Sequence, residues 1–215
     1  MWWNNIYDKQ ITINCGIKNF QQSHNSIVSN ILNWFEIKES KCIQCNQSIY
    51  NFYTFNIFEL DILGAYKSKK NQCITIYDCL GYQQLPKRQN FYCRHCNRYT
   101  QLENTSKIFC SPNSFIFSLD RKYLDTNYLS IPFYVYDKID LNNFIEYDQA
   151  PKQYNLVGII SFGTKEKDYV SFCMSPFNNQ WYYYFNEIIQ NADLNEILNY
   201  HNNMAYIPCI LLYKK

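Results

Sequence analysis

The sequence predicts an α+β protein that is built mainly from antiparallel strands and carries a four-cysteine metal site in its first half. Three observations lead to this prediction. Apolar and polar residues alternate through most of the second half, which is the period of half-buried strands. Helical spacing is confined to a few short stretches. Two Cys-x-x-Cys pairs, formed by Cys42 with Cys45 and by Cys93 with Cys96, flank residues 46–92.

The length and composition favour one domain. A chain of 215 residues can bury one sizeable core. With 5 Gly and 6 Pro, no stretch resembles a flexible linker. We therefore expect a single domain over residues 1–215, with a zinc-finger insert at about residues 40–100.

The charge and hydropathy exclude some partners. A net charge of +2 is too small to imply a nucleic acid backbone or an anionic membrane as partner. No apolar run approaches the roughly 20 residues that span a bilayer, and the N-terminus has no basic region followed by an apolar stretch. We expect an intracellular protein of the nucleus or the cytoplasm, without a membrane partner.

The two cysteine pairs predict a structural zinc ion. The 10 cysteines could form disulfides, but this spacing in a protein without a secretory signal favours metal. Each two-residue spacing lets both sulfurs face one ion, and four thiolates complete a tetrahedron at about 2.3 Å from Zn²⁺. The predicted ligands are Cys42, Cys45, Cys93 and Cys96. His95 is a further candidate, although four cysteines already complete the site.

The first half is predicted to hold two helices and a strand. Apolar residues at helical spacing predict a helix over 26–36, namely Ile27, Ile31, Trp34 and Phe35. A half-buried strand follows from the alternation of Tyr53, Phe55 and Ile57. A short helix around 76–80 leads into the second cysteine pair. The segment between the pairs is therefore structured, since it is too long for a bare connection.

The second half is predicted to be mostly strands. They cover residues 115–119, 133–136, 156–162, 169–174, 181–185 and 206–213. Between the last two, a short helix is indicated by Ile188, Leu194, Ile197 and Leu198.

From about residue 20 onward, these elements in this order resemble the ubiquitin-specific protease family of deubiquitinases. Gln21 and Gln22 before a helix resemble its Gln-Gln-Asp-Ala-x-Glu-Phe segment, and the cysteine pairs resemble its zinc-binding fingers, where Asp-Cys-Leu at 78–80 often precedes the second pair. Residues 112–121 resemble its Pro-x-x-Leu-x-x-x-Leu-x-Arg-Phe strand, and 139–144 its Leu-Asp-Leu-x-x-Phe. The strongest likeness lies in 154–160, 168–172 and 181–186, and it closes at 205–213.

The resemblance implies a papain-like fold with palm and fingers, but with most of the thumb missing. Active members use a Cys nucleophile, a His base and an Asn or Asp that orients the His. Here Asp168 stands at the His position and Asn186 at the Asn/Asp position. The nucleophilic Cys is absent, because Cys15 lacks a Gly-Asn-Thr-Cys-Tyr-like box. Glu166 and Lys167 replace glycines of the groove for the Gly-Gly tail of ubiquitin.

Three functions follow as alternatives, and the sequence leaves open whether the chain is an enzyme. The first is a catalytically inactive scaffold that binds ubiquitin, a ubiquitin-like protein or other subunits of a complex. In this case Trp2 and Trp3, or a partner, would cover the face that the thumb leaves open. The second is an active deubiquitinase whose nucleophile segment is missing from this chain.

The third alternative is a zinc ribbon that binds nucleic acid. Basic residues gather in the finger region, with Tyr92 and Tyr99 between them: Lys67, Lys69, Lys70, Lys87, Arg88, Arg94 and Arg98. Because the net charge is only +2, a solvated basic surface around a structural metal is the better interpretation.

Overall fold

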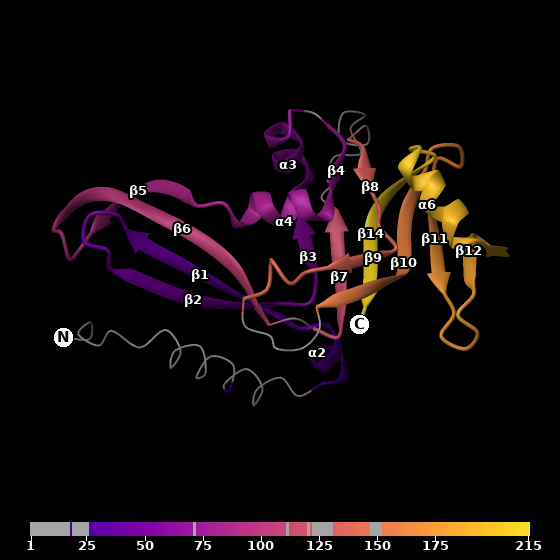
Figure 1. Ribbon diagram of the computed structural model, residues 1–215, viewed down its shortest axis with the longest axis horizontal. Coiled ribbons are helices and arrows are strands. Elements are labelled where there is room, and N and C mark those ends of the chain that lie inside the picture. The colour runs from indigo at the N-terminus through magenta and orange to yellow at the C-terminus, as the bar shows by residue number, and fades with distance from the viewer. Residues whose placement is uncertain are drawn as a thin grey trace.

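Two sheets dominate the computed structural model, which describes Lys18 and residues 26–70, 72–110, 112–119, 121, 131–146 and 152–215. A four-stranded antiparallel sheet with the order β2-β1-β6-β5 extends to one side as the fingers. A mostly antiparallel eight-stranded sheet forms the body of the molecule (Figure 1). Four helices are described, all short. The predicted α+β class is therefore confirmed.

The fingers consist of two hairpins that lie side by side. One hairpin joins β1 (Trp34–Cys42) to β2 (Ser48–Phe55), and the other joins β5 (Lys87–Cys93) to β6 (Arg98–Cys110). The long strands β1 and β6 are the two central strands of the sheet and pair with each other. At the end of β1, Cys42 lies opposite Leu102. Among the described residues, the hydrophobic cluster of the fingers themselves has only Ile37 and Phe109 buried. Packing among these residues therefore contributes little to this sheet.

The first predicted helix is shorter than its periodicity indicates. Helix α2 spans Ile27–Leu32, and the chain is extended from Trp34 onward. The predicted extent over 26–36 is thus wrong at its C-terminal end. Trp34 is buried and stacks on Phe55 and Phe58, with ring centroids 5.0 and 4.5 Å apart. This aromatic packing, together with strand pairing on both sides of β1, outweighs the helical spacing.

The segment between the hairpins is structured, as predicted. It contains β3 (Phe58–Leu60), α3 (Ile62–Ser68), β4 (Ile74–Thr75) and α4 (Ile76–Gln84). Thr75 and Asp78 form a capping box that begins α4, and Lys69 Nζ lies 2.8 Å from Asp78 Oδ2. The helix predicted at 76–80 is therefore confirmed and extends further. Ile57, which was expected within a strand, lies exposed between β2 and β3.

The body sheet has the order β13-β12-β11-β10-β14-β7-β3, and β9 pairs with β10. Its strands, with α6 before the last, follow one another along the second half: β7 (Ser114–Leu119), β8 (Phe133–Tyr134, paired with β4), β9 (Lys138–Asp140), β10 (Gln153–Gly163), β11 (Tyr169–Met174), β12 (Trp181–Phe185), β13 (Ile188–Ala192), α6 (Leu194–Asn202) and β14 (Tyr206–Lys214). The strands predicted in this half are confirmed, except that the one predicted at 133–136 ends at Tyr134. Ile188 was expected in a helix, but it begins β13, which sequence periodicity missed.

The core of the body lies on one face of this sheet. Its largest fully buried side chains are aromatic and include Phe115, Phe117, Tyr154 and Tyr213. Helix α6 covers the same face near β10 and β11, since its His201 contacts Ser161 and the ring of Phe172. Helices α3 and α4 lie beside β3 and β4 (Figure 1). The body therefore has the continuous core that the fingers lack.

A buried serine–histidine pair joins α6 to β10. Ser161 Oγ lies 2.6 Å from His201 Nε2, and both residues are fully buried. The other ring nitrogen, Nδ1, lies 2.7 Å from the carbonyl oxygen of Ile197. Because a carbonyl only accepts, Nδ1 donates and Nε2 accepts from the Ser161 hydroxyl. The ring is therefore held neutral, and burial lowers the pKa of His201 to about 4.

We predict that His201 makes stability fall with acid. The unfolded histidine takes up a proton near pH 6.5, whereas the folded one does so only near its pKa of about 4. The free energy of unfolding should therefore decrease by about 3 kcal/mol as the pH falls from 6.5 to 4. Urea titrations across this window would measure it, with a His201→Gln variant as comparison. Equal pH slopes in the two proteins would contradict the prediction.

Candidate functional site

The four predicted metal ligands meet at the tip of the fingers. The sulfurs of Cys42, Cys45, Cys93 and Cys96 all lie within 4.8 Å of one another. The distance is 3.9 Å between the sulfurs of Cys42 and Cys96 and 3.8 Å between those of Cys45 and Cys93. A tetrahedron with metal–sulfur bonds of about 2.3 Å has edges of about 3.8 Å. The geometry fits one zinc ion, and none of these four cysteines is in a disulfide.

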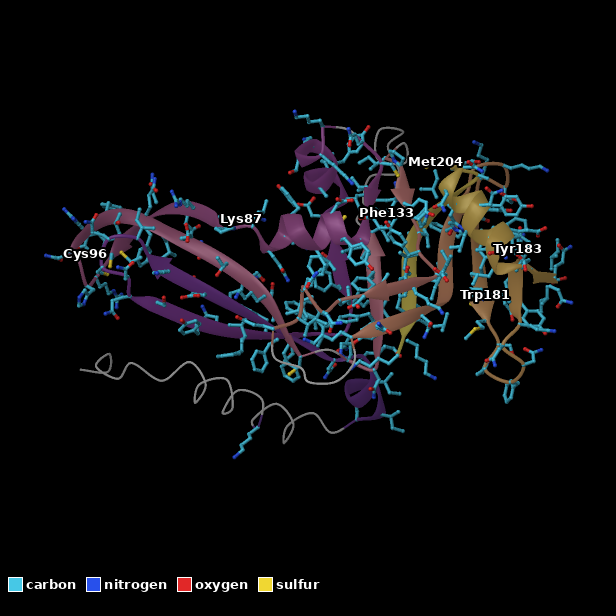
Figure 2. The ribbon with its side chains drawn as sticks, viewed as in Figure 1. Lys87, Cys96, Phe133, Trp181, Tyr183 and Met204 are labelled. Carbon is cyan, nitrogen blue, oxygen red and sulfur yellow. The ribbon has the colours of Figure 1, made fainter. Side chains whose placement is uncertain are left out.

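The local sequence explains why both pairs point inward. Each pair is followed by an asparagine with a left-handed backbone, Asn46 with φ 58° and Asn97 with φ 53°. Asparagine tolerates this conformation better than most residues. In the first turn, the Asn46 N–H donates to the Cys42 carbonyl at 2.9 Å. The repeated Cys-x-x-Cys-Asn pattern thus builds two matching turns at the ends of neighbouring hairpins, as Figure 2 shows around Cys96.

The electrostatics of the cluster suit a cation. The backbone N–H of Cys45 is the main cause that lowers the pKa of Cys42 to about 6. Burial and the neighbouring cysteines raise the pKa of Cys96 to about 12. Four thiolates so close together would repel one another without a positive ion between them. His95 is exposed and does not belong to the sulfur cluster.

Asp168 and Asn186 lie at the same end of the body sheet. Ser171 on β11 pairs with Tyr184 on β12, which brings the turn before β11 next to the turn after β12. Both side chains are exposed, and Asp168 Oδ1 accepts a hydrogen bond from the Tyr169 N–H at 2.7 Å. The histidines of the described residues lie elsewhere, His95 at the finger tip and His201 in the core. Cys15 and His24 fall outside the described residues, as do Gln21, Gln22, Trp2 and Trp3.

The turn that precedes Asp168 is filled by charged side chains. The Lys167 N–H donates to the Gly163 carbonyl at 2.9 Å, and Lys167 has a left-handed backbone with φ 59°. Glu166 folds back over Gly163, so that a Cβ atom added to this glycine would clash with Glu166 Oε2. Glu166 Oε1 accepts a hydrogen bond from Tyr206 at 3.2 Å. The sequence shows only the substitution of glycines and not this contact across the sheet.

Comparisons with known proteins agree with this fold. The family model described as ubiquitin carboxyl-terminal hydrolase matches residues 6–213. The chain belongs to the ubiquitin carboxyl-terminal hydrolase family. The likeness to ubiquitin-specific proteases is thereby confirmed. A search of curated proteins finds no match.

Two solved structures show how this family member compares in three dimensions. A chain of the SAGA Ubp8/Sgf11/Sus1/Sgf73 DUB module bound to ubiquitin aldehyde matches with TM-score 0.68 and 19% identity. The match covers 95% of this chain and 47% of that chain. A chain of the yeast SAGA DUB module matches with TM-score 0.71 and 18% identity, over 93% of this chain and 44% of that one. Our chain thus spans less than half the length of either and shares their fold.

The basic residues predicted to gather near the metal do not form one free surface, and Lys67, Lys69 and Lys70 lie at the end of α3, outside the finger sheet. Lys69 pairs with Asp78 at 2.8 Å, and Arg88 pairs with Glu103 at 3.0 Å. The Lys87 ammonium lies 5.6 Å from the centre of the Tyr82 ring. Several others are exposed, namely Lys67, Lys70, Arg94 and Arg98. Nucleic-acid binding remains a prediction, and these pairings argue against it because they neutralise part of the positive charge.

Within the described residues, no helix is long and apolar enough to cross a membrane.

We predict that Cys93→Ser abolishes zinc binding and destabilises the protein. The purified protein should carry about one zinc per chain, and the variant should carry almost none. Its free energy of unfolding should fall by about 4 kcal/mol or more, because losing a structural metal is among the costliest single changes. Elemental analysis and urea unfolding would measure both. Cys173→Ser, at an exposed thiol on β11, is the matched control, and equal zinc in both variants would contradict the assignment.

Proposed function

We propose that this chain is a catalytically inactive ubiquitin-specific-protease-like domain that works as a protein-binding scaffold. Its bound partners would be ubiquitin, a ubiquitin-like protein or subunits of a larger complex. The observation that carries the proposal is the exposed Asp168 at the position where the family has its histidine base. A single domain over residues 1–215 with a zinc-bearing insert at about 40–100 would form this scaffold.

An aspartate cannot replace the histidine in this chemistry. The ordinary pKa of an Asp carboxyl is near 3.9 and that of a thiol is about 8.5, so the carboxylate is a poor acceptor for the thiol proton. Its negative charge would also disfavour a neighbouring thiolate, which an imidazolium would stabilise. Asn186, at the end of β12, then has no imidazole to orient. Only the third member of the catalytic set would therefore remain.

The turn beside Asp168 also opposes a substrate tail. A groove for two glycines needs backbone without side chains, whereas Glu166 covers Gly163 and bonds to Tyr206. Burial, followed by the nearby charge of Glu166, raises the pKa of Tyr206, so its hydroxyl stays protonated and donates to the carboxylate. The contact between Glu166 and Tyr206 thus occupies the space above the glycine with a bonded pair.

Binding of proteins is supported by exposed apolar surface and by one relative. On α2, Ile27 is 79% exposed and Val28 is 54% exposed. Such adjacent side chains favour a covering partner. The solved chain with a similar fold belongs to a multi-subunit module bound to ubiquitin aldehyde. We propose by this likeness that our chain also binds other proteins, and we transfer no particular partner.

We predict no covalent reaction with ubiquitin that carries an electrophile at its C-terminus. Without a base and an activated thiol, mass spectrometry of the mixture should show only the unmodified protein. Asp168→His is the matched variant, because it restores the base and would gain reactivity only if a nucleophile were already in place. An adduct on any cysteine of the native chain would contradict the proposal and favour the active-enzyme alternative.

A further inference from the structure

The strands β11, β12 and β13 and the helix α6 carry no lysine or arginine, and the nearest lysines before them, Lys165 and Lys167, lie in the turn that precedes β11. Between Lys167 and Lys214 the sequence has no lysine or arginine, although the whole chain carries 20. Residues 169–213 contain three carboxylates, those of Glu187, Asp193 and Glu196. These residues form β11, β12, β13 and α6, which lie at the end of the body opposite the fingers (Figure 1), and most of β14, which lies in the middle of the sheet. His201 adds no charge there because it is buried and neutral.

Strand β13 is the edge of the body sheet at this end. It pairs with β12 and with no other strand of the described residues. Its sequence, Ile-Ile-Gln-Asn-Ala, has no charge and no proline. Ile188 is 48% exposed and Ile189 is 63% exposed. Native sheets usually protect such an edge by lysines, prolines or bulges, so an unprotected edge marks a place for strand addition.

The hairpin geometry determines which backbone groups face outward. The loop between β12 and β13 has two residues, Asn186 and Glu187, and Phe185 pairs with Ile188. A two-residue hairpin closes on a hydrogen-bonded pair, and such pairs alternate along the ladder. Gln190 therefore bonds to β12, whereas Ile189 and Asn191 direct their N–H and C=O groups away from the sheet. Within the described part of the chain, no other backbone group bonds to these two residues.

The charges that flank β13 indicate what would occupy it. Glu187 precedes the strand and Asp193 follows it. Asp193 is fixed in place because its Oδ1 accepts hydrogen bonds from the N–H groups of Asn195 and Glu196 at 2.8 and 3.3 Å. An added strand of similar length would thus have a carboxylate near each end. Opposite charges placed across neighbouring strands are stabilising, and like charges are destabilising.

We propose that β13 binds an extended segment of a partner protein by strand addition, and that this segment has a short uncharged core with basic residues on both flanks. Its backbone would bond to Ile189 and Asn191, and its lysines or arginines would lie near Glu187 and Asp193. This interface goes beyond the scaffold function, since it names a surface and the chemistry of its partner.

A second copy of the chain fits less well. Two β13 strands that run antiparallel about Gln190 would satisfy the outward groups, with Ile189 of one copy against Asn191 of the other. The same register, however, places Glu187 of one copy beside Asp193 of the other at both ends. These like charges oppose self-pairing, whereas a basic segment would neutralise them.

Two synthetic peptides test the proposal with the zinc-loaded chain of 215 residues. One is Lys-Lys-Thr-Val-Thr-Val-Thr-Lys-Lys, and the other has Glu at every Lys. We expect the basic peptide to bind about tenfold more tightly than the acidic one, a difference of about 1.4 kcal/mol. At saturation, hydrogen exchange at the outward amides of Ile189 and Asn191 should slow by about tenfold or more. The amide of Gln190, already bonded to β12, should change little.

Three variants separate the backbone from the charges. Asn191→Pro removes one outward N–H group and leaves the hydrogen bonds between β13 and β12 intact. It should abolish most binding of the basic peptide. Glu187→Lys keeps every backbone N–H group of β13. It should lower the affinity for the basic peptide by about tenfold and raise the affinity for the acidic peptide. Ile49→Lys is the matched control, because Ile49 is a 47% exposed residue on β2, the edge strand of the fingers. It should bind the basic peptide like the native protein.

Three results would overturn the proposal. The first is no binding of the basic peptide, or binding that leaves the amides of Ile189 and Asn191 unprotected. The second is equal affinity for the acidic peptide. The third is self-association that protects these amides without any peptide and disappears in Asn191→Pro, which would assign the edge to a second copy.

Discussion

The meeting of four sulfurs at the finger tip is the interaction on which the extended half of this molecule depends. In the described part of the chain, the finger sheet has only Ile37 and Phe109 in its own buried cluster, so packing among these residues supplies little stability. The cysteine pairs lie at the ends of two hairpins that are separated in sequence by β3, α3, β4 and α4. A metal bound there would tie the hairpins together and would offset the entropy of closing that long segment.

The body needs no such tie because its sheet carries a continuous aromatic core. Strands β10 and β14 lie in the middle of the order and pair along most of their length. The pair of Ser161 and His201 fixes α6 to this core with both ring nitrogens bonded. Asp168 lies exposed at one end of this packed body. A continuous core of this kind is what the proposed protein-binding role requires.

The sequence predicted those parts of the structure that have a local cause. Spacing alone identified the four cysteines whose sulfurs meet, and alternation identified most strands of the body. The extent of α2 was predicted wrongly, because the burial of Trp34 depends on contacts with Phe55 and Phe58 across strands. Strand β13 was missed, because its pairing with β12 depends on a two-residue turn and Ile188 also fits a helical spacing. The fold of Glu166 over Gly163 likewise depends on Tyr206, a residue distant in sequence.

The central claim is that the stability of the finger sheet depends on a bound metal, whereas the stability of the body depends on its hydrophobic core. Hydrogen exchange measured with and without a strong zinc chelator tests it most directly, since each strand is followed separately. The account predicts that amides of β1, β2, β5 and β6 lose protection when zinc is removed, while those of β10, β11 and β14 keep it. Unchanged protection in the fingers, or an equal loss in both sheets, would contradict the claim.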